Sequence, residues 1–377
     1  MAQATTTRGN ANVSGRRPAA LTVLMMPDFR AGNPYQSLLG KAISELGYKV
    51  LFPNGYRRIF PLYRAVREQT APVNILHLHW LTPYLRGKTF VSYLVYALKL
   101  YVDTCLVRLC DVQLVWTIHN RISHESEFPR VELWAMRRIA NSAKRVIVHS
   151  QAALVDLTRD LDLNAGKTVV IPHGHYRDVY TSVIDQVVAK SALGLPKDSL
   201  VYLCFGLVRK YKNIEGLLKA WRRSRGLPPD ALLVLAGEAL QPEYGEEVNL
   251  LAQSSKNVIA HLRHIPAGQV HLYFSAADIV VLPFQRTLTS GSLLLAMSFD
   301  KPVIAPGLDV IVEALGAAGE LLYDPFDEGG LCRALETASS TDLTSLAKRT
   351  RSECDKLSWS AIAQLTVSTY NAACQAA

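Results

Sequence analysis

The sequence predicts an α/β protein made of two doubly wound domains, each with its own parallel sheet. Its 377 residues exceed what one hydrophobic core usually organises. Short apolar runs alternate with helical patterns along the whole chain, which is typical of parallel strands covered by helices on both faces. The series is interrupted near Gly174–Pro196, and this break separates the two expected domains.

The expected strands form two sets of six. In the first half they are Leu21–Met26, Val50–Pro53, Val73–Trp80, Val112–His119, Arg145–His149 and Val169–Pro172. In the second half they are Val201–Gly206, Leu232–Gly237, Val258–His261, Ile279–Phe284, Val303–Ala305 and Leu321–Tyr323. The clearest helix is Asn213–Arg225, whose apolar residues recur at i, i+3, i+4 and i+7. Twin domains of this kind place a ligand cleft between the carboxyl ends of their sheets.

Composition and cysteine usage exclude several classes of protein. With 49% hydrophobic and 19% charged residues, the chain is neither disordered nor collagenous nor a coiled coil. Its six cysteines form no C-x-x-C pair and no zinc spacing, so we expect a reducing compartment rather than a disulfide scaffold or a structural zinc site. Residues 1–19 are polar and lack an apolar core, so they read as a disordered leader rather than a secretory signal.

Charge is spread unevenly along the chain. Residues 1–180 hold 23 Lys/Arg and 12 Asp/Glu, a balance of +11, so the net +9 leaves −2 for the remainder. A basic first half indicates an anionic partner: nucleic acid, an anionic membrane surface or a phosphorylated acceptor. A generally basic proteome is the plainer explanation. No base-stacking module interleaves aromatic residues with the basic ones, so we expect no nucleic acid.

The most apolar stretch, Thr89–Trp116, is interrupted by four charged residues. Its longest uncharged run is Thr89–Leu98, too short for a bilayer span of about 20 residues, so we expect no transmembrane helix. Two interpretations stay open for the amphipathic part, Lys88–Val107: a buried helix of the first domain, or a helix lying on a membrane surface.

Two constellations follow strands of the second half. After Gly206, the three cations Arg209, Lys210 and Lys212 arrive within four residues of one another, just before a helix. Cations and a helix N-terminus together favour an anion, most simply a diphosphate. A solvated basic loop is the alternative.

The second constellation is Thr289-Ser290-Gly291-Ser292, directly before another helix. Thr289 or Ser290 can cap that helix, and Gly291 lets a ligand approach its free backbone N–H groups. Because both constellations lie in one domain, they indicate a phosphate-binding site in a single cleft. The sequence has no G-x-G-x-x-G after its first strand and no P-loop, which argues against a dinucleotide oxidoreductase and a P-loop NTPase.

From about Leu21 onward the chain resembles the GT-B glycosyltransferases, in particular the large family-4 type. The family places a lysine six residues after a glycine, as Gly206 and Lys212 stand here, and Arg209 takes the place of an arginine that usually follows the glycine directly. Further matching pieces are Ile171–Gly174, Leu235–Glu238, Ala277–Pro283 and Lys301–Ala305. Trp359 opens a helical pattern like the family's last helix, which crosses back onto the first domain.

One departure separates the chain from the common family pattern. The family usually carries two glutamates around its Gly-rich turn, and Thr287 and Leu295 stand at those positions here. The Ser-Gly turn at Ser290–Gly291 instead resembles the turn found in a subgroup of the family, the β-mannosyltransferases of lipid-linked saccharides.

The resemblance and the motifs together imply a set of site residues. For donor binding they are Gly206, Arg209, Lys212, Gly237, Glu238, Thr289, Ser290, Gly291 and Ser292. For acceptor binding they are Asn33, Tyr35, His79, Trp80, Asn120 and His124. The catalytic set is His119, Glu125, Arg209 and Lys212, in which His119, Glu125 or Glu127 would take the acceptor proton. Metal binding at His77 and His79 lacks a third ligand, and no metal or other cofactor is expected.

The expected domains are an N-terminal acceptor domain (20–178), a linker (179–197), a C-terminal nucleotide-sugar domain (198–355) and a returning helix (356–377). The expected reaction moves a hexose from GDP-mannose or a UDP-hexose to a saccharide acceptor, lipid-linked, in exopolysaccharide or glycoconjugate synthesis. We expect a cytoplasmic enzyme, peripheral on the inner face of the plasma membrane. The alternatives are a GT-B epimerase or phosphorylase, or an inactive GT-B protein that acts as partner or regulator of another transferase.

Overall fold

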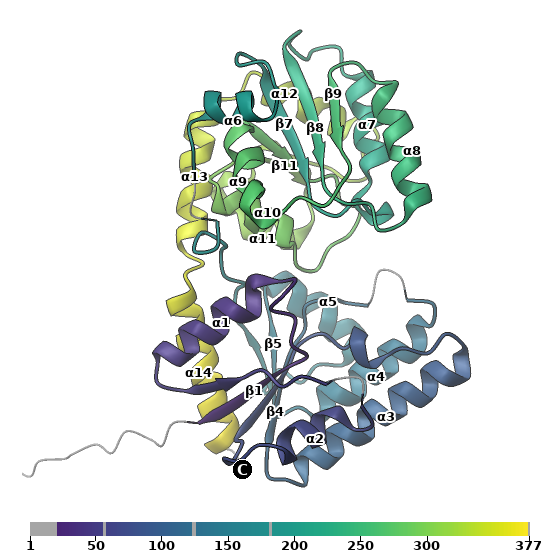
Figure 1. The fold of residues 1–377 in the computed structure, drawn as a ribbon, viewed down its shortest axis with the longest axis vertical. Helices are drawn as coiled ribbons and strands as arrows, with labels where there is room; N and C mark the ends of the chain where they lie inside the picture. Colours follow the sequence, from purple (N-terminus) through teal and green to yellow (C-terminus); the bar gives the residue numbers. More distant parts are fainter. Residues whose placement is uncertain (1–20, 56–57, 123–125, 181–182, 376–377) are drawn as a thin grey trace, which may run out of the picture.

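The computed structural model describes residues 21–55, 58–122, 126–180 and 183–375. The leader expected at 1–19 and the predicted site residues His124 and Glu125 lie outside the described residues. The described chain forms two lobes, one above the other (Figure 1).

The first lobe contains a six-stranded parallel sheet in the order β2-β1-β3-β4-β5-β6. Its strands are β1 (Thr22–Met26), β2 (Lys49–Leu51), β3 (Ile75–Leu78), β4 (Gln113–Thr117), β5 (Arg145–Val148) and β6 (Thr168–Val170). The helices are α1 (Pro34–Glu45), α2 (Pro61–Arg67), α3 (Phe90–Arg108), α4 (Pro129–Ser142) and α5 (Gln151–Leu161), with a 3₁₀ turn η1 (Thr82–Tyr84). The inner strands β1, β3, β4 and β5 are almost wholly buried because helices cover both faces, whereas the edge strands β2 and β6 are partly exposed.

The second lobe repeats this architecture with the order β12-β11-β10-β7-β8-β9. Its strands are β7 (Leu200–Phe205), β8 (Ala231–Ala236), β9 (Val258–His261), β10 (Ile279–Val281), β11 (Val303–Pro306) and β12 (Leu322–Tyr323). The helices are α6 (Gln186–Ala192), α7 (Ile214–Arg223), α8 (Pro242–Gln253), α9 (Ala267–Ala276), α10 (Gly291–Ser298), α11 (Asp309–Leu315), α12 (Gly330–Ala338) and α13 (Leu343–Asp355), with 3₁₀ turns η2 (Lys210–Lys212) and η3 (Gly316–Leu321). The order reverses between β7 and β10, and ligands of open α/β sheets bind at such a switch point. The prediction of two doubly wound parallel domains is confirmed.

The last helix, α14 (Trp359–Gln375), leaves the second lobe and packs on the first (Figure 1). Trp359, Ile362 and Tyr370 share a core with Val23 and Ile75 of the first sheet. The first lobe is therefore built from two pieces of chain that are separated by the whole second lobe.

Two chain segments cross between the lobes and are bonded to each other. The His175 N–H donates to the Leu357 carbonyl at 3.2 Å, and the Trp359 indole N–H donates to the His175 carbonyl at 2.7 Å. A Cβ on Gly174 would lie 2.4 Å from the Trp359 ring, so only glycine fits here. This bonded pair of crossings is the covalent connection between the lobes.

A second contact joins the lobes at the cleft. The Glu313 carboxylate, on α11, accepts hydrogen bonds from the backbone N–H groups of Gln151 (2.8 Å) and Ala152 (2.9 Å). These N–H groups open α5 of the first lobe and have no partner within their own helix. A carboxylate from one lobe thus caps a helix of the other, with a favourable charge for the helix dipole.

Candidate active site

The donor constellation lies at the switch point of the second sheet. Gly206 follows β7 with a φ of +113°, a conformation that favours glycine. A Cβ on Gly206 would lie 2.8 Å from the Lys212 Nζ and 3.3 Å from the Ser292 Oγ. The end of β7, the turn η2 and the start of α10 therefore converge on one small volume.

Lys212 is buried at the centre of this volume. Its side chain is 7% exposed, and its Nζ donates to the Ser292 Oγ at 3.3 Å. Burial, with a smaller contribution from the Arg209 charge, lowers the pKa of Lys212 to about 8. A buried ammonium group beside a second cation, without a carboxylate bonded to it in the described residues, is poised to receive an anion.

The N-terminus of α10 faces the same volume. Ser290 is its N-cap residue, and the Ser290 Oγ accepts from the Leu293 N–H at 3.1 Å. Gly291 is exposed, and a Cβ there would meet only the Tyr176 hydroxyl, at 3.5 Å. The first backbone N–H groups of α10 are thus left for an anionic ligand.

Gly237, at the end of β8, packs directly on Gly206. Its φ is +144°, and a Cβ would lie 2.1 Å from the Gly206 carbonyl oxygen, so no side chain fits. Glu238 follows; its carbonyl accepts from the Val208 N–H at 2.8 Å and its carboxylate lies 3.5 Å from His264. The two glycines allow the two strand ends to come together.

Nucleotide binding should depend on pH through Lys212. A bound diphosphate raises the pKa of Lys212 above its ligand-free value of about 8, so binding takes up a proton when pH exceeds 8. We expect affinity to be nearly constant below pH 8 and to fall by up to about tenfold per pH unit above it. Calorimetry in two buffers of different ionisation enthalpy measures this uptake, with Lys210→Met as the control. Constant affinity between about pH 7.5 and 9.5 would contradict it.

Replacing Gly291 by valine should abolish nucleotide binding and leave the fold intact. The position has room for a Cβ and a normal φ, so the side chain costs the ligand-free protein little. In the complex the valine would occupy the space through which phosphates approach the helix N–H groups. Calorimetric affinity together with the thermal midpoint checks both halves, and unchanged affinity would remove α10 from the donor site.

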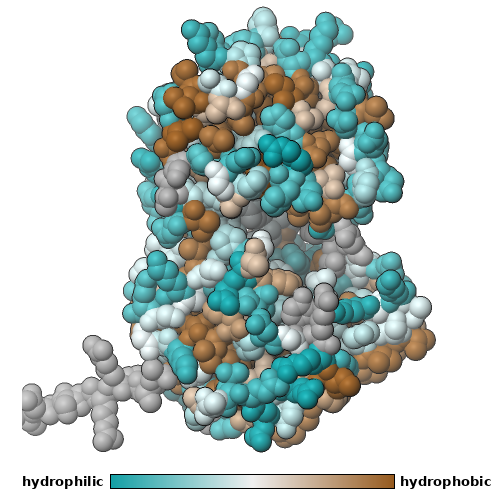
Figure 2. Space-filling model, in the orientation of Figure 1, coloured by the Kyte–Doolittle hydropathy of each residue, from teal (hydrophilic) through white to brown (hydrophobic). Residues whose placement is uncertain are grey.

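A large cleft of about 1030 Å³ opens beside this constellation, between the lobes. The hollowed waist of the molecule is visible in Figure 2. One wall carries Asn120, Arg121, Ile122, Ser126, Pro129, Leu133, Asp156 and Asp160, and the other carries Tyr211, Gln285–Leu288, Gly307–Val310 and Asp324–Phe326. Thr287, at one of the two family glutamate positions, lies in this wall, and its hydroxyl donates to the Thr289 carbonyl at 3.2 Å.

Several cleft residues escaped the sequence analysis. Phe326 is 93% exposed at the rim, and Arg286 and Asp309 are exposed in the same wall. Asp160 forms a bidentate ion pair with Arg121. Their position after strand ends was the signal that could have indicated them, because every one except Asp160 lies within about five residues of the end of a strand.

Most of the predicted acceptor residues do not line the large cleft. Tyr35 is 3% exposed and His79 is 1% exposed, both inside the first lobe. Asn33 is the N-cap residue of α1, and the Asn33 Oδ1 accepts a hydrogen bond from the Tyr35 N–H at 3.0 Å. This structural role also fits the Asn-Pro sequence at the start of the helix. Trp80 is half-buried and stacks on the His119 ring at 4.2 Å. Asn120 is the described acceptor candidate that reaches the cleft.

Five histidines gather at the carboxyl edge of the first sheet, around Tyr35. This histidine cluster consists of His77, His79, His119, His149 and His173, all less than 10% exposed. Burial lowers the pKa of every member, to about 3 for His77 and His173 and to about 4 for His149. The cluster is therefore uncharged at neutral pH.

Hydrogen bonds fix the tautomers of three of these rings. The His149 Nδ1 lies 3.0 Å from the Ile171 carbonyl and must donate, so its Nε2 accepts from the His119 Nδ1 at 3.2 Å. The His119 Nε2 then accepts from the His79 Nδ1 at 3.1 Å, which leaves the His79 Nε2 as an acceptor without a partner in the described chain. Both nitrogens of His119 are thus engaged, and it can take a proton from a substrate only by breaking this chain.

Metal ligation by His77 has no geometric support. Its Nδ1 bonds the Tyr370 hydroxyl at 2.6 Å and its Nε2 bonds the Thr117 hydroxyl at 2.7 Å. Across the described ranges, no group of three or more His, Cys, Asp or Glu side chains is arranged to hold a metal ion.

Comparisons with known proteins assign both lobes. Residues 29–176 match the model of glycosyltransferase family 4, and residues 199–340 match that of glycosyl transferases group 1. A GDP-mannose:glycolipid 4-beta-D-mannosyltransferase of Xanthomonas campestris is 26% identical over 82% of this chain and 83% of its own. A D-inositol 3-phosphate glycosyltransferase of Arthrobacter is 24% identical over 71% of this chain and 67% of its own.

Solved structures show the same fold. Sucrose-phosphate synthase from Thermosynechococcus elongatus superposes with a TM-score of 0.71 at 20% identity, over 95% of this chain and 100% of its own. HepE from Anabaena, solved with UDP and glucose, superposes with a TM-score of 0.68 at 18% identity, over 93% of this chain and 99% of its own. With both halves matched, this protein belongs to the GT-B glycosyltransferases, with a family 4 domain followed by a group 1 domain, and it uses a nucleotide sugar.

Proposed function

We propose that the enzyme transfers mannose from GDP-mannose to a lipid-linked saccharide, in exopolysaccharide or glycoconjugate synthesis. The observation that carries the proposal is the convergence of Lys212, Ser292 and the α10 N-terminus on Gly206. The Ser-Gly turn and the relative that acts with GDP-mannose on a glycolipid support the choice of donor and acceptor. A UDP-hexose is the second donor candidate.

In this mechanism the second lobe binds the nucleotide-sugar donor. Lys212 and Arg209 neutralise the charge that develops on the leaving diphosphate, and the N–H groups of α10 share it. These fixed positive charges make a divalent metal unnecessary. The remaining predicted donor residues, Gly206, Gly237, Glu238, Thr289 and Ser290, border the nucleotide and its phosphates.

The first lobe presents the acceptor hydroxyl and removes its proton. His119 is tied into the histidine cluster through both nitrogens, so we assign the base to a carboxylate of the segment that carries Glu125 and Glu127. Glu127 is exposed and adjoins Ser126 on the cleft wall. His119 then acts by positioning Trp80, on whose ring it stacks, and Asn120, its neighbour in the chain. A cytoplasmic location, at an anionic membrane surface where such an acceptor lies, completes the proposal.

The test combines binding with turnover. Thermal midpoints are measured with GDP, UDP and ADP, since a ligand that binds the native state raises the midpoint by mass action. Turnover is then measured from GDP-mannose and UDP-glucose to a polyprenyl-diphosphate-linked oligosaccharide. We expect stabilisation by GDP and transfer from GDP-mannose. Transfer from UDP-glucose alone would overturn the donor, and nucleotide binding without any turnover would favour the inactive regulator.

A further inference from the structure

Helix α3 is the outermost helix of the first lobe (Figure 1). Its inward face buries Tyr93, Ala97, Leu100, Asp103, Thr104 and Val107. Its outward face carries Val91, Val95, Leu98, Val102 and Leu109, which are between 43% and 83% exposed and are called the α3 stripe below. The helix is therefore apolar on the side that faces solvent as well as on the side that faces the core.

The stripe is continuous along the helix. Its members are spaced by 4, 3, 4 and 7 residues, which places them on one face over a length of about 27 Å at 1.5 Å per residue. Helices on the surface of soluble proteins present charged and polar residues on this side. A contiguous exposed apolar surface of this kind marks an interaction site.

The inward contacts of α3 show that it is packed against α2 and α4 of the first lobe, which argues against a helix that crosses a bilayer. By length and composition alone it could span a membrane, with a mean hydropathy of 1.5 over its most apolar window. However, the buried Asp103 carboxylate accepts from the N–H groups of Leu62 and Tyr63, each at 2.9 Å, and so caps α2. Tyr93 is bonded through its hydroxyl to Glu132 of α4 at 3.2 Å. The helix is thus an integral part of the domain.

The charges around the stripe are mainly positive where solvent reaches them. Between Thr82 and Asp111 the basic residues are Arg86, Lys88, Lys99 and Arg108, whereas one of the two acids, Asp103, is fully buried and the other, Asp111, is exposed. An anionic bilayer complements this arrangement. A second copy of the chain would bring the same positive charges against it, which disfavours a symmetric dimer through the stripe.

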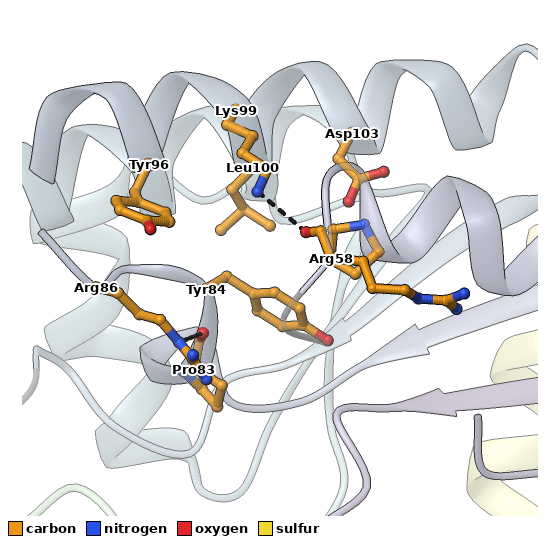
Figure 3. Close-up of a pocket in the computed structure, with 9 residues that line it drawn as sticks. Arg58, Pro83, Tyr84, Arg86, Tyr96, Lys99, Leu100 and Asp103 are labelled. Carbon is orange, nitrogen blue, oxygen red and sulfur yellow. Dashed lines mark hydrogen bonds between the residues drawn. The ribbon is translucent and has the colours of Figure 1, made fainter. Parts of the chain in front are cut away.

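The edges of the stripe are suited to the headgroup region. On one edge, a cavity of about 60 Å³ is lined by Arg58, Arg86, Tyr96 and Lys99 among others (Figure 3). The Lys99 Nζ donates to the Arg58 carbonyl at 3.0 Å and lies 5.6 Å from the Tyr96 ring. On the other edge, Tyr101 packs near Trp134, with ring centroids 6.3 Å apart. Basic and aromatic side chains with apolar stems favour this position at a membrane.

We propose that the α3 stripe docks the enzyme on an anionic phospholipid surface, with the stripe at the boundary of the acyl chains and the flanking cations at the lipid phosphates. The proposal rests on the proposed function for its purpose, since a lipid-linked acceptor lies at that surface. It extends the electrostatic attraction expected from the basic first half with an apolar contribution that salt does not screen.

The test is co-flotation of the full chain with vesicles of phosphatidylcholine, with and without phosphatidylglycerol, over a salt series. We expect binding to the anionic vesicles, of which part survives high salt. The double variant Val95→Asp/Leu98→Asp should lower partitioning by about tenfold or more, because it places two charges at the apolar boundary. Lys88→Glu should remove only salt-sensitive binding. The matched control is Leu250→Asp on α8, a leucine with 59% exposure in the other lobe.

Two results would overturn the docking proposal. One is equal vesicle binding by the wild type and the double variant. The other is a wild-type dimer in sedimentation that ignores vesicles and that the double variant dissociates. The proposed function is measured separately, by GDP stabilisation and by transfer to a detergent-solubilised acceptor, both of which the double variant should retain. Absent transfer with intact vesicle binding would reject the function and leave the docking surface standing.

Discussion

Replacing Lys212 by alanine is expected to lower kcat/KM by roughly 30- to 800-fold, equivalent to about 2–4 kcal/mol of transition-state stabilisation. Lys212 is the buried cation at the point where Gly206, Ser292 and the α10 N-terminus meet, so its ammonium group lies where the leaving diphosphate gains charge. Arg209→Ala should have an effect of the same order, since Arg209 is close enough to lower the pKa of Lys212.

Steady-state kinetics with saturating acceptor measures this loss, and the control is Lys210→Ala. Lys210 is exposed, with its ammonium 5.9 Å from the Tyr244 ring, although it is only two residues away in the chain. A thermal midpoint close to the wild-type value shows that the variants are folded. If Lys210→Ala and Lys212→Ala reduced activity equally, the loop would act through its net charge and not through a diphosphate contact.

Mild acid is expected to unfold the first lobe. The folded pKa of each of the five cluster histidines is depressed by burial, while in the unfolded chain it returns to about 6.5. The unfolded state therefore binds more protons below pH 6.5, so the stability is complete above that pH and is lost as pH falls toward the folded values. Each histidine lowers the free energy of unfolding by up to about 1.4 kcal/mol per pH unit as the pH falls. Five histidines together lower it by about 7 kcal/mol per pH unit, which is comparable with the whole stability of a typical domain.

Urea unfolding at pH 7.5, 6.5 and 5.5, followed by circular dichroism, checks this expectation. We expect the transition midpoint to fall steeply below about pH 6, with an uptake of several protons on unfolding. His264→Gln is the control, because His264 is an exposed histidine outside the cluster. An uptake of one proton or fewer would mean that the cluster is solvated or already charged in the native state.

The strands were predictable because parallel strands buried on both faces are continuous apolar runs. All twelve appear within a few residues of their expected bounds, and Gly206 and Ser290 lie at the strand end and helix start where the sequence placed them. These features depend on local patterns and on the rule that sites lie at carboxyl ends of strands.

The acceptor side was less predictable, because its burial depends on contacts distant in the sequence. His77 of β3 and His79 just after it do lie on one face, as their spacing indicated, but that face is covered by Tyr35 of α1 and Tyr370 of α14. The family resemblance implied that the last helix returns to the first domain, but no local pattern indicates that its Tyr370 bonds His77, 293 residues earlier. For α3, the buried face agrees with the interpretation of a domain helix, and the interpretation of a helix on a membrane surface stays a prediction for its exposed face.

The return of α14 sets the order in which the molecule can be completed during synthesis. The first lobe leaves the ribosome first, yet part of its core consists of Trp359, Ile362 and Tyr370, which are translated only after the whole second lobe. Domains generally fold as they emerge, so the second lobe, which is continuous in sequence, can close while Val23 and Ile75 still lack their cover. The nascent first lobe thus exposes apolar strand residues for the time needed to make nearly two hundred further residues, from the end of β6 to the start of α14. We therefore expect chaperones to bind the first lobe during that interval, and to keep binding a truncated chain that ends at α13.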